Sequence, residues 1–147
     1  MAEIRFYHLL RTPLEAALPK LLERLRSLHA RCLVVAPSRE RVEALDLLLW
    51  SYDPPGFLAH GSAAIGFASD QPIWLTHLDE NPNEANAVLL VEGATIAAPE
   101  QFEHCLDIFD GSDPDAVSSA RERYRSWRAK GHSLKYFKQT EQGWSAG

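Results

Sequence analysis

Apolar and polar positions along this chain follow two different periods. Short, nearly continuous apolar runs alternate with longer segments in which apolar residues recur every three or four positions. The short runs predict buried β-strands, and the longer segments predict amphipathic helices. The predicted strands are 4–10, 31–37, 73–78 and 85–93, a short one at 56–60 within a loop-rich stretch, and a more polar one at 132–138.

Capping residues place the ends of the predicted helices. Thr12 and Ser38 stand where the N-caps of two helices are expected. Asp113, followed by proline, and Gly131 mark the beginning and the end of a late helix. The predicted helices are 11–30, 38–53, 98–111 and 112–131.

The third predicted helix rests on spacing alone. Phe102, Cys105, Leu106 and Phe109 recur at helical intervals, and Gly111 follows as a stop. Strands that alternate with helices through short links predict an α/β domain with a mainly parallel sheet and helices on both faces. A length of 147 residues favours a single domain over 1–147, with a frayed tail at about 139–147.

Charge is distributed unevenly over a chain of formal charge −5. Residues 1–41 carry a net charge of +4, residues 42–120 contain no Lys or Arg and carry −14, and residues 121–147 carry +5. Nucleic acid would be repelled by most of such a surface, because affinity for it comes largely from neutralised phosphates. A local basic pocket for a short anionic ligand fits this pattern better.

Sequence motifs of catalysis and cofactor binding are missing. The chain has neither a phosphate-binding loop of the G-x-x-x-x-G-K-[ST] type nor a G-x-G-x-x-G fingerprint, and its histidines show no metal-ligand spacing. Cys32 and Cys105 stand in apolar contexts typical of buried thiols. We therefore expect no cofactor, no metal and no catalytic residues. The chain also lacks a long apolar run and a recognisable signal peptide, which favours a cytoplasmic protein without a membrane contact.

Several blocks of sequence resemble the chi subunit family of bacterial DNA polymerase III holoenzyme. The most specific is the arginine-rich block at 120–134, and the order of the blocks over one short domain strengthens the match. The blocks are "FYHL" at 6–9, "LDLLLWSYDPPGFLAHG" at 45–61, "QPIWL" at 71–75, "NAVLLV" at 86–91 and "ARERYRSWRAKGHSL" at 120–134.

The resemblance implies a Rossmann-like, three-layer fold and a non-catalytic accessory role in DNA replication. Such a subunit joins the clamp loader, through a small partner called psi, to the acidic C-terminal tail of single-stranded DNA-binding protein (SSB). It thus contacts nucleic acid only indirectly, through SSB. The tail ends in aspartates, a proline and a terminal phenylalanine.

Both binding sites can be assigned to residues of this chain by the resemblance. Arg121, Tyr124, Arg125 and Arg128 share one helix face and would hold the tail, because guanidinium groups bind carboxylates at two points and a tyrosine can wall a slot for a ring. Trp50 and Phe57 would contact psi as aromatic anchors.

Three alternatives follow from the residues themselves. The arginines could form a solvated face, and Trp50 and Phe57 could belong to the core. An α/β enzyme could use the loop 56–71 with His60 or His77 as acid–base. A direct binder of single-stranded DNA could use the late basic helix with Trp127 or Tyr136 for stacking.

Overall fold

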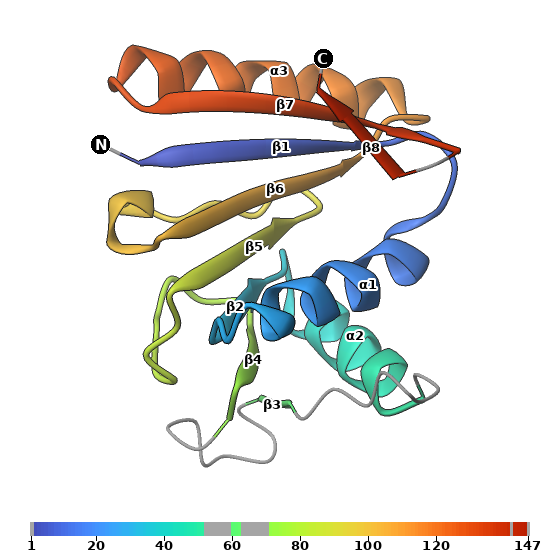
Figure 1. The fold of residues 1–147 in the computed structure, drawn as a ribbon, viewed down its shortest axis with the longest axis vertical. Coiled ribbons are helices and arrows are strands. Elements are labelled where there is room, and N and C mark those ends of the chain that lie inside the picture. Colours follow the sequence, from blue (N-terminus) through green and yellow to red (C-terminus); the bar gives the residue numbers. More distant parts are fainter. Residues whose placement is uncertain (1, 52–59, 63–70, 142, 147) are drawn as a thin grey trace.

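An eight-stranded sheet organises the computed structural model, which describes residues 2–51, 60–62, 71–141 and 143–146 (Figure 1). The strand order is β3-β4-β2-β5-β6-β1-β7-β8; all pairings are parallel except that of β8 with β7. The strands are β1 (Glu3–Leu9), β2 (Cys32–Val35), β3 (Gly61–Ser62), β4 (Ile73–Thr76), β5 (Ala87–Val91), β6 (His104–Asp110), β7 (Ser133–Thr140) and β8 (Gly143–Ala146).

Helices cover both faces of the sheet. The helices α1 (Leu14–Ser27) and α2 (Arg39–Ser51) pack on one face, and α3 (Pro114–Ala129) packs on the other against β6 and β7. Strand side chains alternate between two buried clusters: Phe6 of β1 belongs to the α3 side and Tyr7 to the α1 side. The three-layer, Rossmann-like α/β fold expected from the sequence is therefore confirmed.

The predicted helix at 98–111 is wrong, because this segment forms a single 3₁₀ turn, η2 (Pro99–Gln101), and then strand β6. Every residue from Cys105 to Phe109 is buried, with alternate side chains on the two faces of the sheet. A helix would have exposed some of these positions. Asp107 interrupts the apolar run, so that the remaining apolar residues also fit a helical period, and periodicity alone cannot separate the two structures.

The end of the chain forms a strand where the sequence predicted a frayed tail. Residues 143–146 form β8, which pairs antiparallel with β7, and Trp144 packs against the core. Of the strand expected at 56–60, residues 56–59 lie outside the described residues, and the strand observed nearby is β3 at Gly61–Ser62.

The N-cap expected for α1 is wrong, and the N-cap expected for α3 is confirmed. Thr12 does not cap α1; its hydroxyl accepts a hydrogen bond from Gln139 Nε2 at 2.7 Å, and Gln139 Oε1 accepts from the backbone N–H of Arg11 at 2.8 Å. For α3 the expected cap is confirmed, since Asp113 Oδ1 accepts from the Asp115 N–H at 3.0 Å. Gly131 follows the helix with a φ of +90°, the left-handed region that favours glycine.

Candidate functional site

Positive charge gathers at one edge of the sheet. The two basic segments of the sequence supply β1, α1, β2, more than half of α3, β7 and β8, and of these β1, β7 and β8 are neighbours at that edge (Figure 1). The acidic middle of the chain supplies β3 to β6 and nearly all of α2. The fold therefore turns a pattern along the sequence into a molecule with a basic end and an acidic end.

Helix α3 presents three of its four arginines to solvent, because its apolar residues pack against the sheet on the opposite side. Ala120 and Trp127 are buried against the sheet, whereas Arg121, Arg125 and Arg128 are exposed. These three positions are separated by four and three residues, so they follow one another along a single helix face.

A pocket of about 570 Å³ lies between α3 and the strands β1, β6 and β7. Of the four residues predicted to share a site, Arg121, Tyr124 and Arg125 line this pocket, and Arg128 is not part of its lining. Apolar side chains form the floor, and polar ones stand around it. The lining residues are Phe6, Phe109, Val117, Ala120, Arg121, Tyr124, Arg125, Tyr136 and Lys138.

Tyr124 forms a wall of this pocket. Its ring packs against Phe6 with the centroids 5.4 Å apart and the planes tilted by 58°. Phe109 lies edge-on to Phe6 at 6.4 Å. The arrangement leaves an aromatic and aliphatic surface beside two guanidinium groups, which suits a ligand that carries both a ring and a carboxylate.

Tyr136 and Lys138 complete the pocket, and sequence reasoning did not assign them to it. Both belong to β7, where alternation places them with Leu134 on the α3 side of the sheet. The signal was present in the sequence, since the strand was predicted at 132–138. It could not be used without knowing which face of the strand α3 covers.

His8 stands next to the pocket and contacts the Tyr136 hydroxyl through Nδ1. Burial lowers the pKa of His8, and the positive charges of Lys138 and Arg121 lower this pKa further, while the backbone of Gly111 and the carboxylate of Asp110 oppose the change. Burial also raises the pKa of Tyr136. At neutral pH His8 is therefore neutral and Tyr136 keeps its proton.

Arg123 has a structural role although it belongs to the same arginine-rich block. Its Nε and Nη2 donate to the two carboxylate oxygens of Asp107 at 2.7 and 3.0 Å. The Asp107 side chain is only 1% exposed, in the middle of β6. Burial raises the pKa of Asp107, and the guanidinium of Arg123 opposes that rise. This bidentate pair ties α3 to the sheet.

The predicted partner site is described only in part. Trp50 is 46% exposed near the end of α2, and Leu47, one turn earlier on the same helix, is 68% exposed. His60 is buried, and its ring lies 4.5 Å from that of Trp50. Trp50 is thus a surface residue and does not belong to the core. Phe57 lies outside the described residues.

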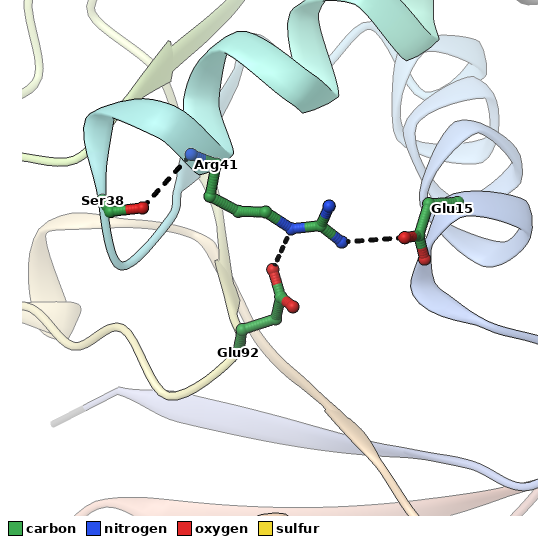
Figure 2. Close-up of polar contacts among 4 residues, drawn as sticks. All are labelled: Glu15, Ser38, Arg41 and Glu92. Atoms are coloured by element: carbon green, nitrogen blue, oxygen red, sulfur yellow. Dashed lines mark hydrogen bonds and ion pairs between the residues drawn. The ribbon is translucent and has the colours of Figure 1, made fainter.

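The carboxyl ends of β2 and β5 meet an ion-pair network (Figure 2). After β2 the chain continues on one side of the sheet, and after β5 it continues on the other side. The carboxyl ends of two such neighbouring strands are where α/β folds commonly bind ligands. Here Arg41 contacts Glu92 through Nε and donates from Nη2 to Glu15 at 3.1 Å, as Figure 2 shows. Ser38 Oγ accepts from the Arg41 N–H at 3.2 Å, so the expected cap of α2 is confirmed.

Other reactive groups stand apart from the pocket. Burial raises the pKa of both Cys32 and Cys105 to about 12, so both stay thiols. Trp127 is only 5% exposed, which removes it as a stacking platform for single-stranded DNA. Within the described ranges, no three His, Cys, Asp or Glu side chains are grouped to hold a metal ion, and no helix is long and apolar enough to cross a bilayer.

The chain is thus an α/β-domain protein with a pocket that combines buried apolar side chains and exposed cationic ones. The chain belongs to the family of the DNA polymerase III chi subunit, HolC, whose model matches residues 1–135. It is also similar to a "Probable DNA polymerase III subunit chi" of Rickettsia prowazekii (strain Madrid E), with 25% identity over 109 residues. That alignment covers 74% of this chain and 66% of the relative. The family is that of an accessory subunit in DNA replication.

Proposed function

We propose that this chain is a non-catalytic adaptor of the replicative polymerase that captures the acidic C-terminal tail of SSB in the α3 pocket. The proposal rests on one observation above all: Arg121, Arg125 and Tyr124 line a hollow whose floor is apolar. Family membership supports the replication role. A cytoplasmic location follows from this role.

The chemistry of the tail matches the pocket part by part. The ring of its terminal phenylalanine would lie on the floor formed by Phe6, Phe109 and Ala120. The terminal carboxylate would be bound by Arg121 and Arg125, because guanidinium groups bind carboxylates at two points. The preceding aspartates would meet Arg128, which is exposed outside the pocket on the following turn of α3.

Lys138 and Tyr136 extend this match on the side of the sheet. Lys138 offers a further positive charge for an aspartate, and the Tyr136 ring adds surface beside it. Val117 lines the pocket at a position where some members of the family it resembles place a lysine. Lys138 would offset the charge missing at Val117, so that the pocket keeps three cations in its lining.

Calorimetric titration with a synthetic tail peptide tests the tail site. Arg121→Ala should weaken binding about ten-fold, because a partly exposed charge-assisted contact contributes about 1–1.5 kcal/mol. Arg121→Lys should recover only part of that loss, since lysine cannot make the planar two-point contact. A peptide without the terminal phenylalanine should lose at least as much.

Arg39→Ala provides the matched control, because Arg39 is an exposed arginine on α2. Its tail affinity should equal that of the unchanged protein. Unaltered affinity in folded Arg121→Ala and Arg125→Ala proteins would place the tail elsewhere.

The second half of the proposed role concerns psi, or another clamp-loader partner, at Trp50 and Phe57. The support is the exposure of Trp50 and Leu47 one turn apart on α2, because a large exposed aromatic ring beside a second apolar side chain is typical of an interface anchor. Trp50→Ala should leave the melting temperature nearly unchanged and reduce co-purification of the partner. Leu10→Ala, at a 49% exposed leucine after β1, is the control. Equal loss of partner in both variants would contradict a site on α2.

A further inference from the structure

The outer strands carry a second hollow surface on the face opposite α3. Helix α1 packs alongside β2 and β6 and leaves the α1 side of β1, β7 and β8 incompletely covered. Two hollows of about 380 and 230 Å³ lie there, and they share Leu21, Arg24 and Trp144 as lining residues. The three shared residues make the two hollows neighbours, and we name the pair of hollows the α1 groove.

Aromatic rings form one side of the α1 groove. Tyr7 stacks on Phe137 with centroids 5.2 Å apart and planes 19° from parallel. Trp144 meets Tyr7 edge-on at 4.9 Å and lines both hollows. The Trp144 ring is half-buried, so one part is fixed by packing and another part faces the groove. A fixed, partly exposed indole is a platform on which a flat ring can stack.

Positive side chains run along the same groove. Arg11 and Lys20 line the first hollow, Arg5 lines the second, and Arg24 lines both. The single acid in either lining, Glu141, is paired with Arg11 at 3.1 Å. In the part of the chain that the structure describes, Lys20 and Arg24 have no ion-pair partner. Their charges are therefore available to an external anion.

A buried polar atom also opens a role for a ligand. His104 lines the second hollow, and its Nδ1 is buried without a hydrogen-bond partner among the described residues. Leaving a buried nitrogen unsatisfied is unfavourable, and a ligand that donates to it or accepts from it would relieve this.

We propose that the α1 groove binds single-stranded nucleic acid. Phosphates would lie along Lys20 and Arg24, and one base would stack on Trp144. The α1 groove combines several cations with an aromatic ring. Proteins that hold single strands without reading their sequence use these two features together. An acidic peptide without an aromatic residue would use the cations but gain little from the indole, so the nucleic acid fits both features.

This proposal is independent of the SSB-tail site because the two surfaces lie on opposite faces of the sheet. Together they would let one basic end of the molecule hold a protein tail on one face and a nucleic-acid strand on the other. The acidic middle of the chain would repel the strand and keep it at this end.

Fluorescence anisotropy with a labelled oligothymidylate of about 12 nucleotides, at several low salt concentrations, tests the groove. Arg24→Gln and Lys20→Gln should each weaken binding and reduce the slope of log affinity against log salt by about 0.7, the value for one phosphate contact on a single strand. Trp144→Leu should weaken binding about ten-fold, and Trp144→Phe should retain most of it. Replacing the bases by abasic sites should mimic Trp144→Leu.

Matched variants, each tested with both ligands, distinguish this site from the tail pocket. Arg121→Ala should leave oligonucleotide binding unchanged, and Arg24→Gln should leave tail-peptide binding unchanged; Arg39→Gln should affect neither. Undetectable binding at low salt would overturn the proposal. Affinities of Arg24→Gln and Lys20→Gln equal to that of the unchanged protein would also overturn it, as would a loss of binding confined to Arg121→Ala. Tighter groove binding of a polyglutamate peptide of equal charge would overturn it in favour of an acidic protein partner.

Discussion

Breaking the ion pair between Arg123 and Asp107 should destabilise the fold far more than removing any neighbouring arginine of α3. Arg123→Ala leaves a carboxylate that is 1% exposed, inside a sheet, without its two hydrogen bonds. Removing one partner of a buried pair costs about 3–5 kcal/mol. For a chain of this size about 3 °C of melting temperature corresponds to 1 kcal/mol, so the melting temperature should fall by roughly 9–15 °C.

Urea and thermal unfolding measure this loss, with Arg128→Ala as the control on the exposed face of the same helix. Arg128→Ala should stay within about 0.5 kcal/mol of the unchanged protein. The double variant Asp107→Leu/Arg123→Met should recover most of the stability, because apolar residues of similar volume often replace a buried pair without loss.

The pH dependence of the Arg123→Ala variant gives an independent check. Burial raises the pKa of Asp107, and without Arg123 nothing opposes that rise. A carboxyl group with a raised folded-state pKa binds a proton more readily in the folded state than in the unfolded state. The deficit in stability should therefore be largest at neutral pH and shrink as the pH falls. A deficit equal to that of Arg128→Ala, or one that grows on acidification, would refute the reasoning.

Three further predictions concern residues near the carboxyl ends of the strands. Tail affinity should rise once the pH falls below the ordinary titration range of histidine, because His8, whose pKa is lowered by burial, then gains a positive charge beside the pocket; peptide titration against His8→Leu, in which the rise should shrink, checks this. Gly111→Ala should lower stability by about 1–3 kcal/mol, since a Cβ there would overlap the His8 ring and lie 2.6 Å from the Leu9 carbonyl oxygen; a melting temperature equal to that of the parent would contradict it. Arg41→Ala should cost about 1 kcal/mol in urea unfolding, because its partners are partly exposed, with Arg39→Ala as the near-neutral control.

Most of the architecture was readable from the sequence because the strands of a parallel sheet are apolar on both faces. Strand β5 is the clearest case, with all five residues buried. Helix α3 was predictable from its cap, its proline and its terminal glycine. Strand β6 was not, because Asp107 divides its apolar run and only the guanidinium of Arg123, far along the chain, explains a carboxylate there.

The candidate site was predictable only where its residues share one helix. Arg121, Tyr124 and Arg125 have helical spacing, so a pattern could group them. Tyr136 and Lys138 come from a strand on the far side of a turn, and they meet the helix only through the fold. Arg123 could not be separated from its neighbours, since nothing in the local sequence marks a cation that points inward.

The network of Arg41 with Glu15 and Glu92 means that the chain supplies its own anion at the edge where other α/β proteins place a phosphate. Glu15 lies in the first turn of α1, where the helix dipole favours negative charge, and its own backbone N–H and Arg41 lower its pKa. In a nucleotide-binding protein this helix end would be neutralised by a diffusible ligand that comes and goes. Here the counter-charge is covalently part of the chain, so this end of the helix is already neutralised without a ligand, and a phosphate arriving there would meet two carboxylates already held by the same arginine.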